Sequence, residues 1–513
     1  MAASRASVKA LKPQKGLILV VLVIIIVLAF ASYTLSGLSV SQVKVDRDKQ
    51  TQISLKKAKQ AVINYAITYA DRSVGNRYGV MPNPETLFNG NDGNMVGSTI
   101  GRYVNVVEWL PWRSLDIENI KGDSGNCLFY AVTGSYKIGT PADMMNEDSF
   151  GMFRVRNAAD EIVQGSNVED QIVALVIAPG EALPGQTRNP TVATSSCGRD
   201  YTNVTAYLEG NGTYDNGTLL TSADSVDDFI HATTTSDTEA QPYNDKFLTI
   251  SRDEIWDPIV NRSDFKQTMR NLTQGLAMCL SAYANLADNT GRRLPWPAKT
   301  DLGLATYDRK KYRNNPNYDD DDGASQGYSG RFPYSIDDSN DAINSAALTV
   351  DEILNIPGLC DDLDLGGGVR INLSKTASPT PLVLDYDEFW NNWKDHYFYM
   401  VSKVYEPDNS GTKKVCADAS TTCIRVNGTE YAGAVIFSGS RRGGVTRVDK
   451  RLIAEYLEDA KDLSFNTEQA DKTGDGAYVY TNPDAVPDVA NDIMYCIQDQ
   501  PVASPLDVTE CNF

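Results

Sequence analysis

The sequence predicts an α+β protein in which a long N-terminal helix is followed by two tandem modules, each a helix with an antiparallel sheet. Three observations lead to this prediction. An uncharged apolar segment runs directly into a helical pattern, the remaining sequence repeats itself, and in each repeat a helical stretch precedes short β-rich runs, such as 171–178 and 431–438. That order favours an antiparallel sheet over alternating βαβ units.

The N-terminal segment has the charge pattern of a membrane anchor. Residues 1–16 hold four basic side chains and no acid, residues 16–43 carry no charge, and Leu17–Ala31 is unbroken apolar. About 20 such residues span a hydrocarbon core of about 30 Å. Positive charge before the span orients the N-terminus to the cytoplasm. We therefore expect a basic leader at 1–16, a transmembrane helix at 17–40, and all later residues outside the cytoplasm.

A cleaved secretory signal is the alternative interpretation of this segment. Ala29-Phe30-Ala31 offers the small-x-small pattern of a cleavage site. The apolar stretch runs past this site into a helical pattern, which favours an anchor. Apolar residues recur mostly every three or four positions from Ile53 to Tyr69, with lysines on the other face. An amphipathic helix at 41–72 should therefore continue the span and pack on the first module.

The remaining sequence is internally duplicated, which predicts modules at 53–262 and 263–513. Short matches occur in collinear order, with a larger insertion at about 335–390 that contains the loop Gly366–Gly368. The matched segments include Met81-Pro82-Asn83-Pro84 with Leu294-Pro295-Trp296-Pro297, Phe129–Val132 with Phe398–Val401, Gly180 and Arg188 with Gly439 and Arg447, and Tyr207-Leu208-Glu209 with Tyr456-Leu457-Glu458.

Charge and cysteine content narrow the class of protein. The net charge of −20 disfavours nucleic-acid binding, which needs basic surface. Eight cysteines all follow the predicted span, and no CxxC motif is present, so disulfides in an oxidising compartment are expected. Proximity along the chain favours the pairs Cys416–Cys423 and Cys496–Cys511, although sequence alone leaves the connectivity open.

The N-terminus resembles a type IV prepilin. Lys15-Gly16 followed by Leu17-Ile18-Leu19-Val20-Val21 fits a basic leader that ends in Gly and precedes a long apolar helix. Leu110-Pro111-Trp112-Arg113 and Leu128–Val132 extend the resemblance to large pseudopilin-like proteins of type II secretion and type IV pilus systems. The resemblance implies processing by a prepilin peptidase between Gly16 and Leu17.

The resemblance also implies partners and a location. Other pilin or pseudopilin subunits would pack on the N-terminal helix, and an inner-membrane platform would assemble them. The chain would reside in a bacterial inner membrane, with its modules in the periplasm or outside, and then in a surface filament. One departure is Val21, where major pilins usually have Glu. Its absence suggests a minor, tip-proximal subunit, or an anchor that is never cleaved.

Enzyme signatures are scarce, and no catalytic residue is predicted. The sequence has only two histidines, His231 and His396, at non-equivalent places in the two copies, and no HExxH, GxSxG or GxxxxGK[ST] motif. A structural or surface role is the expectation for His396. A structural, non-enzymatic subunit is thus predicted, with a membrane-tethered adhesin or receptor and an envelope enzyme of unrecognised type as the rivals.

Calcium is the one cofactor that the sequence raises. Asp471, Thr473 and Asp475 place side-chain oxygens at alternate positions before Gly476, as at the start of a calcium loop. The twelfth position is Asn482 instead of a bidentate Glu, so a plain acidic turn is the alternative. Tryptophans near Pro or Gly, such as Trp109 and Trp390, suggest either sugar stacking or core packing, and core packing is the expectation.

Overall fold

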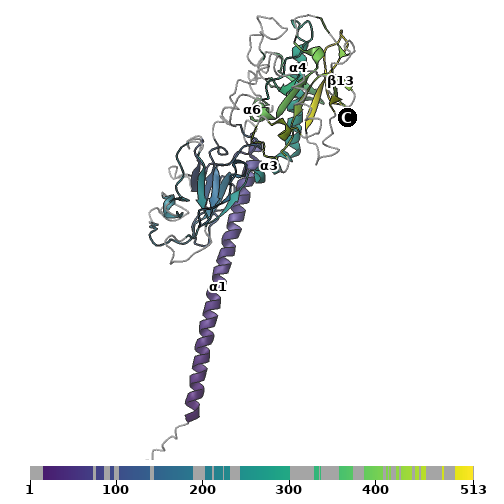
Figure 1. Cartoon of the computed structure of the whole chain (residues 1–513). Helices are drawn as coiled ribbons and strands as arrows, with labels where there is room; N and C mark the ends of the chain where they lie inside the picture. The colour runs from purple at the N-terminus through teal and green to yellow at the C-terminus, as the bar shows by residue number, and fades with distance from the viewer. Residues whose placement is uncertain are drawn as a thin grey trace, which may run out of the picture.

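The computed structural model describes most of the chain as two α+β units connected to one long helix (Figure 1). The described residues are 15–72, 77–85, 93–96, 103–138, 144–188, 203–210, 213–222, 225–231, 243–300, 328–333, 336, 358–373, 386–407, 412–413, 415–416, 423–426, 429–441, 445–449, 452–457, 477–478 and 492–511.

The N-terminal helix α1 runs from Lys15 to Ile67, and α2 follows at Tyr69–Arg72. Figure 1 shows the first part of α1 projecting away from both units, while its last part lies against the first sheet. The large apolar side chains from Leu19 to Phe30 are 48–70% exposed, whereas Leu55, Ala58 and Val62 are fully buried. One helix therefore carries an exposed apolar segment and a packed segment.

Among the described residues, the structure contains no helix that is both long and apolar enough to span a bilayer. In the predicted span at 17–40, the side chains of 17, 18, 31 and 34–40 lie outside the description. The predicted transmembrane helix accordingly remains a prediction.

The first unit is built on a four-stranded antiparallel sheet in the order β1-β2-β5-β7. Helix α1 packs on β5 and β7. A second sheet, in the order β4-β3-β6, contains a parallel pair between β3 and β6. The strands are β1 Val106–Trp109, β2 Phe129–Val132, β3 Phe153–Arg156, β4 Ile162–Gln164, β5 Ala174–Ala178, β6 Asp227–Ile230 and β7 Lys246–Ile250.

The second unit is built on one seven-stranded sheet. Strands β8, β11, β13 and β15 are adjacent in that order and antiparallel, and helix α4 packs on β13 and β15. Strand β12 forms a parallel pair with β14, and β16 extends the sheet beyond β15. The elements are α4 Ser263–Ala284, β8 Ser329–Arg331, β11 Tyr397–Val401, β12 Ile424–Val426, β13 Thr429–Phe437, β14 Ala477–Tyr478, β15 Ile493–Gln498 and β16 Val508–Glu510.

One difference between the units is the length of β13. Its first residues pair with β12 and its later residues with β11, so it makes in one strand the pairings that β4 and β5 make separately in the first unit. Mixed α+β structure with antiparallel sheets is therefore confirmed. The predicted module boundaries at 53–262 and 263–513 are compatible with this layout and remain a prediction.

The remaining elements are short helices, 3₁₀ turns and one hairpin. The predicted loop Gly366–Gly368 connects the two strands of a hairpin. All three glycines have positive φ values, 87°, 61° and 83°, which glycine adopts without strain. This hairpin is in the described part of the predicted insertion. The elements are α3 Asp253–Val260, α6 Tyr386–Trp393, β9 Leu363–Gly366, β10 Val369–Ile371 and the 3₁₀ turns Val168–Asp170, Val204–Ala206, Lys394–His396, Lys403–Tyr405 and Ile453–Glu455.

The hydrophobic core is continuous from α1 through the junction into the second unit. At the junction, Trp256 of α3 contacts Trp393 of α6 at 5.8 Å between ring centroids. The opposite face of each sheet has its own smaller cluster, around Trp109 in the first unit and Tyr456 in the second. Trp109, Trp390 and Trp393 are all buried, as core packing requires.

Candidate functional site

The sequence-predicted sites are only partly within the described residues. Gly16 and Leu17 lie in the first turn of α1, with side chains outside the description. Asp471, Thr473 and Asp475 lie outside the described residues, so the calcium loop remains a prediction.

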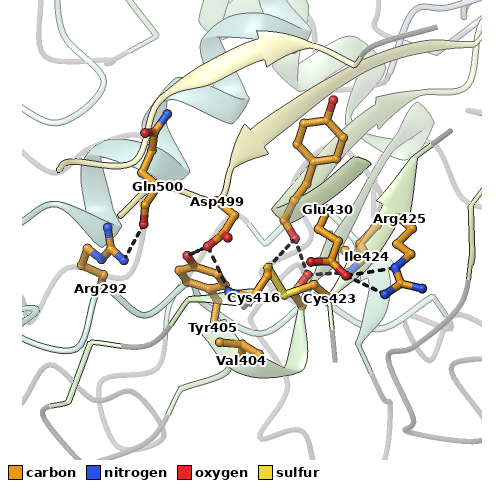
Figure 2. The surroundings of a disulfide bond; sticks show 12 residues. Arg292, Val404, Tyr405, Cys416, Cys423, Ile424, Arg425, Glu430, Asp499 and Gln500 are labelled. Carbon is orange, nitrogen blue, oxygen red and sulfur yellow. Dashed lines mark hydrogen bonds and ion pairs between the residues drawn. A yellow bond between two sulfur atoms is a disulfide. The ribbon is translucent and has the colours of Figure 1, made fainter. Parts of the chain in front are cut away.

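Disulfides stabilise the second unit. Cys416–Cys423 and Cys496–Cys511, the two pairs expected from proximity, are bonded, and Cys279 of α4 is bonded to Cys360 beside the β9–β10 hairpin. Figure 2 shows the surroundings of Cys416, whose backbone N–H donates to Asp499 at 3.2 Å. Asp499 also accepts from the hydroxyl of Tyr405.

The structure also reveals a buried charged cluster between the two units. Its first half is the acidic loop 144–150, which lies within the connection between β2 and β3 in the first unit. The Asn146 side chain accepts from the Asp148 N–H at 2.9 Å, and the Asn146 carbonyl accepts from the Ser149 N–H at 3.0 Å. The Tyr136 hydroxyl donates to the Ser149 carbonyl at 2.6 Å. These bonds fix the loop conformation, so the side chains of Glu147 and Asp148 point out of the first unit in defined directions.

The loop is bound by the end of α6 and the turn that follows it. The Met145 N–H donates to the Asn392 side chain at 2.9 Å, and the Asn146 side chain donates to the Asn392 carbonyl at 2.8 Å. The Asn146 amide also donates to Asp395 Oδ1 at 3.0 Å. Asn146, Asn392 and Asp395 are buried, so these bonds form away from water and fix how the units meet.

His396 lies at the centre of this contact and is fully buried. Its Nδ1 is 2.8 Å from Asp395 Oδ1, which assigns the Nδ1 proton to that bond. Its Nε2 is 3.5 Å from Asp148 Oδ2 and 3.7 Å from Glu147 Oε1, and has no hydrogen-bond partner among the described atoms. Burial by itself would lower the pKa of His396, but the nearby carboxylates of Asp395 and Asp148 outweigh it and raise the pKa.

Two buried arginines and a tyrosine complete the cluster. Arg447 Nη1 donates to Glu147 Oε1 at 2.7 Å, and Arg331 Nη1 donates to the Asp395 carbonyl at 2.7 Å. The Tyr456 hydroxyl donates to Asp148 Oδ2 at 3.1 Å. Three carboxylates and two guanidinium groups thus surround the imidazole, so the site favours a further positive charge on its Nε2 side.

Sequence reasoning missed this cluster. The expectation for His396 was a structural or surface role, and the acidic pair Glu147-Asp148 was not singled out. About 250 residues separate the loop from its partners, as the Asn146–Asp395 bond shows. The available signal was the rarity of histidine, because only two occur in the chain and one follows an Asp directly.

Comparison of the chain with protein-family models, curated proteins and solved structures gives no match.

Proposed function

We propose that the chain is a structural, non-enzymatic, pilin-like subunit of a type IV pilus or type II secretion pseudopilus, located near the filament tip. The observation that carries the proposal is the division of α1. Its side chains from Leu19 to Phe30 are exposed and apolar, while Leu55, Ala58 and Val62 are buried against the sheet of the first unit. A helix that is half exposed and half packed is suited to join one globular unit to an apolar partner.

An exposed apolar helix needs an apolar environment. The large side chains of residues 19–28 point to all sides of the helix and are all at least 48% exposed, so one contact face would not cover them. A lipid bilayer or a bundle of similar helices covers a helix from every side. We infer that α1 is held in a bacterial inner membrane before assembly and packs with other subunits afterwards.

The repeated layout of the two units supports the tandem-module part of the proposal. In each unit a helix packs on two neighbouring strands of an antiparallel run of four, β1-β2-β5-β7 in the first and β8-β11-β13-β15 in the second, and the unit also contains one parallel strand pair. Helix-on-sheet is the arrangement that the resemblance to pseudopilins implies. The two units together would form the exposed head.

Val21 supports a minor subunit. A carboxylate at this position would neutralise the N-terminal amine of a neighbour, and valine has none. A head of two units is also bulky for a shaft whose subunits rise by roughly seven helical residues, about 10 Å. Both arguments favour the tip or a low copy number.

N-terminal sequencing tests the proposal most directly. The full chain would be produced together with a prepilin peptidase, and the mature protein should begin at Leu17. Replacing Gly16, as in Gly16→Val, should block processing, and the control Gly37→Ala should leave it unchanged. A mature start at Ser32 would indicate secretory cleavage and overturn the proposal. An intact Met1 in the presence of the peptidase would favour the rival, a tethered adhesin or receptor that does not assemble.

A further inference from the structure

We propose that Glu147, Asp148 and His396 form a binding site for one divalent transition-metal cation of the zinc class, and that the cation joins the two units. The acidic loop of the first unit supplies two ligands, and the second unit supplies the imidazole. The site is separate from the predicted loop at Asp471 and does not depend on filament assembly.

The distances fit a small ion. One ligand atom from each of the three residues lies within 4.8 Å of the other two. Zinc bonds of about 2.0–2.1 Å in tetrahedral geometry place neighbouring ligand atoms about 3.3 Å apart. His396 Nε2 is already 3.5 Å from Asp148 Oδ2 and 3.7 Å from Glu147 Oε1. The imidazole nitrogen is thus within a few tenths of an ångström of coordination spacing from each carboxylate, while the two carboxylates lie within 4.8 Å of each other and would have to move closer together.

The orientation of His396 is the independent observation that points to a ligand. Asp395 holds the Nδ1 side of the ring, so Nε2 faces the two carboxylates. His396 is fully buried, and this nitrogen has no hydrogen-bond partner among the described atoms. A carboxylate that holds one imidazole nitrogen while the other faces the ion is the usual arrangement around metal-binding histidines. Asp395 would fill that outer position.

The donor set selects the kind of ion. Imidazole nitrogen with carboxylate oxygens suits zinc and neighbouring transition metals, whereas calcium prefers oxygen ligands alone. The two guanidinium groups of Arg331 and Arg447 do not balance the carboxylates of Glu147, Asp148 and Asp395. A proton on Nε2 would add one positive charge, whereas a divalent cation would add two. Measurement of bound metal distinguishes these two sources of charge.

The consequence is a link between binding and the contact between units. Glu147 and Asp148 are fixed by the loop of the first unit, and His396 by the turn after α6. A cation bound by all three favours the docked arrangement, because separation of the units would break its coordination. All three side chains are at most 4% exposed, so the ion must enter while the units are apart or during folding.

Metal content and affinity test the proposal on the full chain in detergent. The protein would be stripped with a chelator, equilibrated with Zn²⁺ and dialysed, and bound zinc measured by mass spectrometry. Affinity would be measured by competition with a chromophoric zinc chelator. Wild type should retain one zinc per chain at this site. Asp148→Asn and His396→Gln should lose that ion, or bind at least about 100-fold more weakly, and the matched control His231→Gln should retain it.

A second measurement covers variants that fail to fold. Co²⁺ added to the stripped wild-type chain should give the visible absorption of a four-coordinate N/O site, which Zn²⁺ should remove and Ca²⁺ should not. A wild-type chain that binds neither Zn²⁺ nor Co²⁺ would overturn the proposal and leave a proton on His396 Nε2. Zinc retained undiminished by His396→Gln would place the ion elsewhere and would also overturn it.

Discussion

The guanidinium of Arg447 lies over the ring of Tyr456, 4.8 Å from its centroid. Arg188 lies over Tyr207 in the same way, at 4.7 Å. Each arginine also donates through Nε to the carbonyl of the residue before its tyrosine, at 2.8 Å for Arg447 and 2.9 Å for Arg188. The alignment of the two repeats pairs Arg188 with Arg447 and Tyr207 with Tyr456, and the structure places the two pairs in the same relative position.

The two arginines also bind equivalent glycines. Arg188 donates to the Gly180 carbonyl at 2.9 Å, and Arg447 to the Gly439 carbonyl at 3.4 Å. Each glycine follows the central strand of its sheet by two residues, after β5 or after β13. In each unit, the arginine therefore links the segment that follows the central strand to the turn that precedes the tyrosine. Of the two arginines, Arg447 also forms an ion pair with Glu147.

Replacing Arg447 should cost far more stability than replacing Arg188. Arg447→Gln leaves the Glu147 carboxylate without its guanidinium partner at a site where both are at most 5% exposed, which costs about 3–5 kcal/mol. Arg188→Gln loses hydrogen bonds to backbone carbonyls near solvent, which costs about 1–2 kcal/mol. Urea unfolding of both variants measures the difference. Equal losses would mean that the ion pair contributes nothing beyond the shared contacts.

Local patterns in the sequence predicted much of the fold. Recurring apolar residues from Ile53 to Tyr69 indicated the packed end of α1, and β-rich runs at 171–178 and 431–438 contain most of β5 and β13. These patterns can be recognised in the sequence because the period of a helix or a strand determines which face of that element each residue occupies. Closely spaced cysteines indicated two disulfides for a similar reason, since short loops close easily.

Contacts between the units were not predictable in this way. The acidic loop 144–150 has no periodicity, and its partners Asn392, Asp395 and His396 lie in another unit. Nothing local distinguishes a buried acid such as Asp148 from a solvated one, because burial here results from docking of folded surfaces. Contacts such as the Asn146–Asp395 bond join the two units and form only when they meet.

Stability should fall as pH rises from 5 to 8 because of Glu108. Burial in β1, opposite Tyr130 of β2, raises the pKa of Glu108 from its usual value of 4.5 to about 7. Between these values the folded state binds more protons than the unfolded state, so the free energy of unfolding decreases with increasing pH. Glu108→Gln should remove this slope and raise the free energy of unfolding at pH 8 by about 3 kcal/mol.

Urea unfolding at pH 5, 6, 7 and 8 measures the effect of Glu108. Glu118→Gln is the matched control, because the hydrogen bond from Lys57 lowers the pKa of this exposed carboxyl below its usual range. Its pKa therefore lies below the window, and the slope should be that of wild type. A slope that persists unchanged in Glu108→Gln would assign it to other groups.

Trp256 should determine whether the two units unfold together. Its Nε1 donates to the Tyr136 hydroxyl at 3.0 Å in the first unit, and its ring packs edge-on against Trp393 of the second. Truncation to alanine, Trp256→Ala, removes both contacts and leaves a cavity at the junction, which costs about 3–5 kcal/mol. Since the core continues from one unit into the other through this junction, the variant should unfold in two separate calorimetric transitions.

Trp109 supplies the matched control for this junction. It is as deeply buried as Trp256 but lies in the outer cluster of the first unit, with its ring 4.0 Å from that of Phe129. Trp109→Ala should therefore destabilise the first unit by a similar amount without removing any contact between units. Wild type and Trp109→Ala should share the same number of calorimetric transitions, and Trp256→Ala should gain one. If Trp256→Ala kept the wild-type number, cooperativity would depend on the polar contacts around His396 instead of on the aromatic junction.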